Sequence, residues 1–265
     1  MHFSHKNASF YRISEKKALS LQFVMGISIM AIGNATPDSF YSESRIGCAD
    51  AVSWAERALA DGASILDIGG CSTRPGSSPV EEEEEWRRVC PVLEAIRDRF
   101  PEAALSLDTF RPEIARRALE QFGRIMINDI SGGCEAMYEV VRRYGARYVW
   151  TLRGDLSLPS QRPEMGDMDL VLDPGFGFTG GVENDWRCMR EMDRLQVYAK
   201  PILVGVSRKS MLYKPLGITP DSCGEATQVL HLYALEHGAT ILRVHDVALT
   251  AQTVRLYETM VNGKL

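Results

Sequence analysis

The sequence lacks the features of several protein classes. No run of 18 apolar residues occurs, so we expect no transmembrane helix, and no secretory apolar core precedes Leu19. None of the six cysteines forms a Cys-x-x-Cys pair, and no Cys/His spacing is typical of zinc. A basic excess is also missing, since the formal net charge is −5. We therefore predict a cytoplasmic protein with free thiols, without a membrane or general nucleic-acid partner, although local cations still allow an anionic substrate.

Short apolar runs that end on a polar or charged residue recur along the whole chain. Runs of this kind are typical of parallel strands buried on both faces. The 265 residues suit one (β/α)₈ barrel, which typically has roughly 250 residues. The sequence thus predicts a single α/β barrel at 23–265 after an amino-terminal extension at 1–22. The expected strand ends are Asn34, Asp67, Asp108, Asn128, Thr151, Asp173, Ser207 and His245.

Helical segments are predicted between most of these strands, but one connection is too short. Helices are expected at 49–59, from Val80, from Pro112, and at 182–198, 219–237 and 250–261. Only residues 152–168 separate the fifth and sixth strands, and they contain two prolines and two glycines. A crossover with its helix needs at least about 10–12 residues plus turns. We therefore predict that the helix between strands 5 and 6 is missing or much shortened.

The polar strand ends predict a pocket. In a (β/α)₈ barrel the carboxyl ends of all strands meet at one mouth, where the chemistry of this fold takes place. The alternative for any single aspartate is a role in capping the next helix, whereas several together favour a ligand. The residues expected to converge are Asn34, Asp108, Asn128, Asp173, Arg243 and His245.

Seven blocks, in order, resemble the dihydropteroate synthase family from about residue 29 to 260. They are NATPDSF at 34–40, DIGGCSTRPG at 67–76, SLDT at 106–109, NDISGG at 128–133, LDPGFGF at 172–178, GVSRKS at 205–210 and RVHDV at 243–247. The resemblance implies a (β/α)₈ enzyme of folate synthesis. Such an enzyme joins 4-aminobenzoate to 7,8-dihydropterin-6-ylmethyl diphosphate, uses Mg²⁺, is a sulfonamide target and commonly forms a homodimer.

The resemblance also implies roles for individual residues. The pterin-binding residues would be Asp108, Asn128, Asp173 and Lys209, which suit a ring edge of N–H donors and ring acceptors. The diphosphate would meet Asn34, Arg243 and His245, with Asn34 also near the metal. Aminobenzoate and the closing loops would involve Asp38, Phe40, Thr73, Arg74, Pro75, Phe178 and Ser210.

The chain departs from the family pattern at three places. Ser42 stands where the family has an acidic residue in the loop after strand 1. Trp150-Thr151-Leu152 replaces Met-His-Met on strand 5, and Trp150 either stacks on the pterin or fills the core. The short fifth connection is the third departure. These changes leave two alternatives to the synthase: a pterin-binding homologue with weakened catalysis, and a pterin-dependent methyltransferase domain.

Overall fold

A computed structural model describes residues 26–35, 48–71, 80–156 and 168–263 of the chain. Eight parallel strands follow the sheet order β6-β5-β4-β3-β2-β1-β8-β7, and a bridge between Leu172 and Ile202 joins the two edges. The predicted (β/α)₈ barrel is confirmed, whereas the extension at 1–22 lies outside the described residues. The strands are β1 (Ser28–Asn34), β2 (Ile65–Gly69), β3 (Ala104–Asp108), β4 (Met126–Asp129), β5 (Tyr148–Thr151), β6 (Leu170–Asp173), β7 (Leu203–Val204) and β8 (Ile241–Val244).

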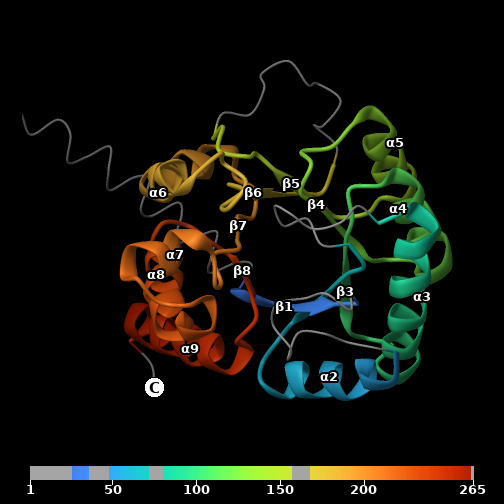
Figure 1. Ribbon diagram of the computed structural model, residues 1–265, viewed down its shortest axis with the longest axis horizontal. Coiled ribbons are helices and arrows are strands. Elements are labelled where there is room, and N and C mark those ends of the chain that lie inside the picture. The colour runs from blue at the N-terminus through green and yellow to red at the C-terminus, as the bar shows by residue number, and fades with distance from the viewer. Residues whose placement is uncertain (1–25, 36–47, 72–79, 157–167, 264–265) are drawn as a thin grey trace, which may run out of the picture.

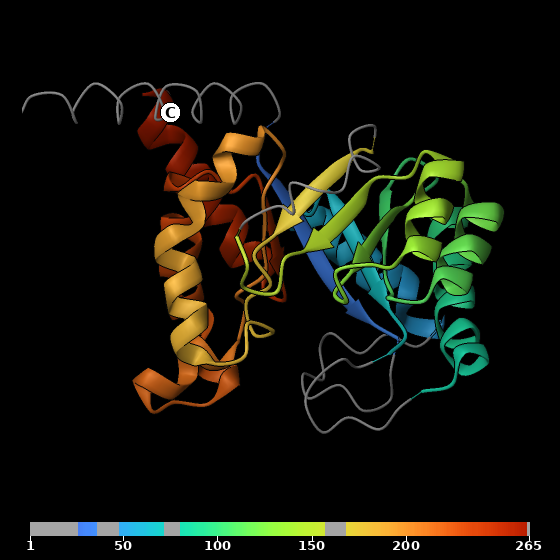
Figure 2. The same cartoon turned by 90° about the horizontal axis from the view of Figure 1, so that it is seen from above.

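Helices surround this sheet (Figure 1). Seen from above, α6 to α9 lie on one side of the strands and α3 to α5 on the other (Figure 2). The α-helices are α2 (Cys48–Ala60), α3 (Glu82–Arg99), α4 (Pro112–Phe122), α5 (Glu135–Tyr144), α6 (Val182–Glu191), α7 (Ser210–Leu216), α8 (Gly224–Glu236) and α9 (Val247–Asn262). The 3₁₀ helices are η3 (Met192–Tyr198) and η4 (Pro220–Ser222).

Several predicted boundaries change. The helix expected at 182–198 is α6 followed by η3, and the one expected at 219–237 is η4 followed by α8. The short helix α7, which begins at the last residue of the 205–210 block, was not predicted. Between β5 and β6 the described residues, 152–156 and 168–169, contain no helix. The predicted loss of that helix remains a prediction for 157–167.

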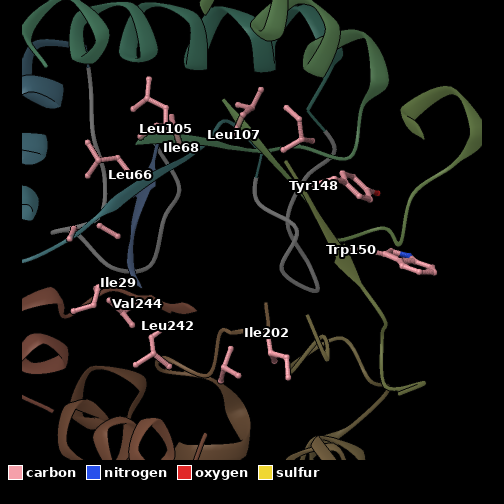
Figure 3. Close-up of a cluster of buried hydrophobic side chains, with 14 of the residues drawn as sticks. Ile29, Leu66, Ile68, Leu105, Leu107, Tyr148, Trp150, Ile202, Leu242 and Val244 are labelled. Carbon is pink, nitrogen blue, oxygen red and sulfur yellow. The ribbon is translucent and has the colours of Figure 1, made fainter. Parts of the chain in front are cut away.

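The two faces of the strands bury different sets of side chains. A cluster inside the barrel takes one residue from each of seven strands: Met30, Ile65, Met126, Val149, Val171, Leu203 and Ile241. Residues two positions further along share this inner face, because strand side chains alternate. The alternate residues pack in the main core, and Figure 3 shows Tyr148 and Trp150 projecting outward from the same side of β5.

Trp150 therefore belongs to the core and not to a ligand pocket. Its indole Nε1 donates to the carbonyl oxygen of Gly132 at 2.9 Å, and the residue is only 5% exposed. Two roles were predicted for Trp150: stacking on the pterin and filling the core. Because Trp150 lies on the outer face of β5, it fills the core, and the prediction of stacking inside the barrel is wrong. Thr151, the next residue, faces inward.

Candidate active site

The inner faces of four adjacent strands carry one row of residues at the barrel mouth. The sheet register pairs Asn34 with Gly69, Gly69 with Asp108, and Asp108 with Asn128. Gly69 has no side chain to fill the space between its neighbours, and a Cβ there would lie 3.4 Å from Cβ of Asp108. The row confirms the predicted convergence of Asn34, Asp108 and Asn128 on one mouth.

Arg243 of β8 reaches across the barrel to carboxylates on β2 and β3. Its Nε donates to Oδ2 of Asp67 at 2.7 Å, and its Nη2 donates to Oδ2 of Asp108 at 2.6 Å. The same Oδ2 of Asp67 accepts a hydrogen bond from Nδ2 of Asn128 at 3.0 Å. One arginine and one buried carboxylate thus connect three of the predicted site residues.

The three charged residues of this network, Asp67, Asp108 and Arg243, influence one another's protonation. Burial raises the pKa of Asp108, Arg243 opposes that rise and Asp67 adds to it. Burial alone would lower the pKa of Arg243, but Asp67 and Asp108 together raise it above its usual value. The guanidinium therefore stays protonated and partly neutralises two carboxylates, of which Asp67 is fully buried and Asp108 is 20% exposed.

Asp173, at the end of β6, is oriented by both of its oxygens. Oδ1 accepts from the backbone N–H of Gly175 at 2.8 Å, and Oδ2 lies 3.4 Å from Oγ1 of Thr151. Burial raises the pKa of Asp173, while Lys209 lowers it. The left-handed φ of 83° at Gly175, together with its contact with Arg153, requires a glycine in this turn.

Lys209 supplies the second cation of the pocket. Its Nζ donates to the carbonyl oxygen of Phe176 and lies 5.1 Å from the centre of the Phe178 ring. Burial lowers the pKa of Lys209 to about 8, with Asp173 opposing the shift. Lys209 and Phe178 are therefore neighbours, and Lys209 also lies close enough to Asp173 to influence its pKa.

His245 is oriented by the loop after β7. Oγ of Ser207 lies 3.0 Å from Nδ1 of His245 and accepts from its backbone N–H at 3.3 Å. The neighbouring residues form an ion pair, in which Arg208 binds Asp246 through Nε at 3.2 Å and Nη2 at 2.8 Å. Arg208 has a left-handed φ of 58°, which is uncommon for a residue other than glycine. The ion pair joins the segments that follow β7 and β8, next in sequence to Lys209 and His245.

Five predicted residues lie outside the described part of the chain: Asp38, Phe40, Thr73, Arg74 and Pro75. Ser210 is the first residue of α7. Cys71 is the last described residue before 72–79. Burial and the negative charge of Glu85 raise the pKa of its thiol, and the raised pKa disfavours the thiolate. Among the described cysteines, Cys90, Cys134, Cys188 and Cys223 have free thiols.

Sequence reasoning missed the central role of Asp67. We expected it to end its strand, but β2 continues to Gly69, so Asp67 lies two residues below the mouth and is fully buried. Thr151 was also missed as a partner of Asp173. The available signal was alternation, because Asp67 and Thr151 each stand two positions after an inward apolar residue.

Metal and membrane features can be judged only for the described ranges. In that part of the chain no three His, Cys, Asp or Glu side chains are grouped closely enough to hold a metal ion. No helix there has the length and apolar character needed to cross a bilayer.

Comparisons with known proteins identify the family. The model of the family described as "Pterin binding enzyme" matches residues 30–165 and 160–245. The chain is 33% identical to dihydropteroate synthase of Escherichia coli K12, covering 89% of this chain and 92% of the relative. It is 34% identical to that of Streptococcus pyogenes serotype M3, covering 83% and 90%.

Solved structures agree. The Clostridium difficile dihydropteroate synthase with pteroic acid superimposes with a TM-score of 0.78 at 30% identity, covering 89% of this chain and 97% of that one. The Xanthomonas albilineans enzyme with 4-aminobenzoic acid gives 0.78 at 33% identity, covering 89% and 93%. The chain belongs to the dihydropteroate synthase family.

Proposed function

We propose that this barrel condenses 7,8-dihydropterin-6-ylmethyl diphosphate with 4-aminobenzoate, giving 7,8-dihydropteroate and diphosphate. The observation that carries the proposal is the buried network of Arg243, Asp67, Asp108 and Asn128 at the barrel mouth. Relatives of the chain have been solved with pteroic acid and with 4-aminobenzoic acid. The network supplies the polar groups that the pterin half of such a ligand needs.

The pterin would bind by its hydrogen-bonding edge. Carboxylate and amide oxygens accept from ring N–H and exocyclic amine groups, and a lysine donates to ring acceptors. Asp173 is already oriented by Gly175 and Thr151, and Lys209 lies in the same pocket. We assign Asp108, Asn128, Asp173 and Lys209 to the pterin. Preformed orientation of these groups reduces the ordering cost on binding.

The diphosphate would bind to hydrogen-bond donors on β8 and directly after it, of which Arg243 carries the positive charge. Arg243 and His245 are two residues apart and share the inner face. Arg243 uses Nε and Nη2 for Asp67 and Asp108, which leaves the Nη1 group for an oxygen of the diphosphate. If Ser207 donates to Nδ1 of His245, the ring carries its proton on Nε2 and can donate from there. Positive charge at this point favours departure of the diphosphate.

Mg²⁺ fits this mouth as a substrate-bound ion. The described residues offer Asn34 and no cluster of carboxylates, and Mg²⁺ commonly keeps several waters and binds through phosphate oxygens with few protein groups. Asn34 would hold it through its amide oxygen at the end of β1. When bound, the ion would neutralise charge on the leaving diphosphate.

The reaction needs no covalent enzyme intermediate. The aminobenzoate nitrogen forms a bond to the methylene carbon, the carbon–oxygen bond to diphosphate breaks, and the amine then loses a proton. Positioning and electrostatic stabilisation are therefore the tasks of the protein. We assign aminobenzoate to Phe178 and Ser210, together with Asp38, Phe40, Thr73, Arg74 and Pro75, which lie outside the described residues.

We also propose that the protein is a homodimer. Large apolar side chains are exposed on α8 and α9, where Val229 is 68%, Leu256 71% and Met260 62% exposed. The two helices pack against each other, so these residues, with Leu232 and Leu249, supply apolar surface to a helical pair. A second copy of the chain would cover it, because exposed apolar surface of this kind marks interfaces.

The free thiols support a reducing, cytoplasmic location.

The decisive experiment measures diphosphate release by the purified protein with Mg²⁺ and dihydropterin diphosphate, with and without 4-aminobenzoate. We expect aminobenzoate-dependent release together with formation of dihydropteroate. Sulfonamides, which mimic aminobenzoate, should inhibit this release. Pterin binding without turnover would contradict the proposal and favour a binding-only homologue, with the 41–44 segment as the first place to restore the family residues.

A further inference from the structure

Asp67 is a fully buried carboxylate that none of the roles assigned above uses directly. It lies on β2, in register with Ile32 of β1 and Ser106 of β3, one inner-face position below Gly69 at the mouth. One oxygen, Oδ2, accepts from both Arg243 and Asn128. A buried carboxylate that binds two residues of a pocket from beneath can set the direction in which both of them point.

We infer that Asp67 is a positioning residue for dihydropterin diphosphate, acting through Arg243 and Asn128 without touching the ligand. The inference rests on the proposed assignment of those two residues to the substrate. Both oxygens of Asp67 are shielded, since Oδ1 is buried and has no partner among the described residues and Oδ2 is covered by its two donors. The carboxylate therefore affects the ligand only by what it does to its neighbours.

The effect on Asn128 is chemical as well as geometric. An ionised carboxylate accepts hydrogen bonds and cannot donate them, so it selects the orientation in which the amide nitrogen of Asn128 faces Asp67. That orientation directs the amide oxygen of Asn128 away from Asp67, where it can accept from a pterin N–H group. Without the carboxylate the amide could turn over and present a donor to a donor.

The effect on Arg243 is to fix the plane of the guanidinium. Two carboxylates, Asp67 at Nε and Asp108 at Nη2, bind different sides of one rigid fork. Removing the Asp67 charge turns its charge-assisted bond with Nε into a weaker neutral one, so Arg243 is held mainly by Asp108, the residue that must itself meet the pterin. The guanidinium is then fixed less firmly in its plane, and its Nη1 group loses direction toward the diphosphate.

Asp67→Asn is a suitable variant because the site can accommodate an amide. Its oxygen can remain at the Oδ2 position, and the register neighbour Ser106 offers a buried Oγ that has no partner among the described residues. The substitution removes the charge while nearly preserving volume. Ser106→Ala is the matched control, since it changes the register neighbour of Asp67 and no group bonded to Arg243 or Asn128.

The test is calorimetric binding of dihydropterin diphosphate with Mg²⁺ to the wild type, Asp67→Asn, Ser106→Ala, Arg243→Ala and the Asp67→Asn/Arg243→Ala double variant. We expect Asp67→Asn to weaken binding about tenfold or more, because a charge-assisted contact is lost. Ser106→Ala should change the affinity less than about threefold. Asp67→Asn should weaken binding much less in the Arg243→Ala background, because part of its action passes through Arg243. The KM for 4-aminobenzoate should not change.

Two results would overturn the inference. One is unchanged affinity in a folded Asp67→Asn variant although Arg243→Ala binds weakly. The other is full additivity in the double variant, together with equal losses for both substrates, which would show a general structural role. Normal binding by Arg243→Ala would instead refute the assignment of Arg243 to the diphosphate. Weak binding by Arg243→Ala with normal binding by Asp67→Asn would refute only the inference about Asp67.

Discussion

Nη2 of Arg243 lies 2.6 Å from Oδ2 of Asp108. The residue assigned to the diphosphate is thus bonded to a residue assigned to the pterin edge. The charge and direction of Arg243, which meets the diphosphate, therefore depend on Asp108. Those of Asp108, which meets the pterin, depend on Arg243 in turn. Substitution of either residue should therefore affect binding of the whole substrate and not of one end alone.

Arg243→Lys tests this connection. Lysine retains the charge but cannot bridge two carboxylates with a planar fork. Loss of one or two charge-assisted hydrogen bonds, about 1.5–3 kcal/mol each, predicts a decrease in kcat/KM for dihydropterin diphosphate of about 10²-fold. Steady-state kinetics at saturating aminobenzoate measures it. A decrease below threefold would show that the bridge between Asp67 and Asp108 has no importance for the substrate.

Asp173→Asn and Arg74→Ala should separate the two substrates. The Asp173 variant replaces an acceptor with a group that can donate to the pterin edge, so we expect pterin binding to become undetectable by calorimetry. Arg74→Ala should leave pterin affinity within about twofold and weaken the aminobenzoate step, measured as KM for aminobenzoate. Unchanged pterin affinity in Asp173→Asn would refute the assignment of this residue.

Pterin affinity should depend on pH through Lys209. Its pKa is lowered to about 8, so the proton leaves as the pH rises past 8, and the neutral amine is a weaker donor. Affinity should therefore be highest below pH 8 and fall by up to about tenfold per pH unit above it. Calorimetry between pH 7 and 9.5 measures this dependence. Lys209→Arg remains charged throughout, so an equal fall in that variant would assign the dependence to the ligand.

Neighbouring residues on β5 should respond in opposite ways. Trp150→Phe removes the buried bond to Gly132 and should cost about 1–2 kcal/mol of unfolding free energy, with pterin affinity unchanged. Thr151→Val removes the hydroxyl beside Asp173 and should weaken pterin binding about twofold to tenfold, with a small effect on stability. Urea unfolding and calorimetry on the same samples compare them. Loss of pterin affinity in Trp150→Phe would restore a ligand role for the indole.

The α8–α9 surface should control assembly. Leu256→Glu places a charge on this apolar face and should convert a dimer to a monomer in sedimentation velocity measurements. Val197→Glu, at an exposed apolar residue of η3, is the matched control and should leave the dimer intact. A wild-type protein that sediments as a monomer at all concentrations would rule out the proposed homodimer.

Much of the site could be predicted from strand ends. Asn34, Asp108, Asn128 and Asp173 each follow an apolar run and stand where the structure ends a strand or one residue before its end. A parallel barrel brings all such ends together, so one local pattern is enough to indicate a shared mouth. The loops that carry Asp38, Phe40, Thr73, Arg74 and Pro75 lie outside the described residues, and their roles remain predictions.

The sequence does not show how far Asp67 lies below the barrel mouth, or which face of β5 carries Trp150. An error of two residues in the end of β2 moves a side chain from the mouth to the interior, and the choice of face at Trp150 depends on the absolute register of β5. Polar residues before a strand end look alike in sequence. Their separate roles depend on what the neighbouring strands place beside them.

The order and spacing of the apolar runs are enough to predict the barrel and the set of polar residues at its mouth, because such runs specify buried parallel strands whose ends share one side. Which of those residues bind one another depends on the three-dimensional fold. Arg243 and Asp67 are 176 positions apart in the chain, and their contact exists because β1 joins β8 to β2 in a closing sheet. Such a pairing depends on strand order and register, which no local pattern contains.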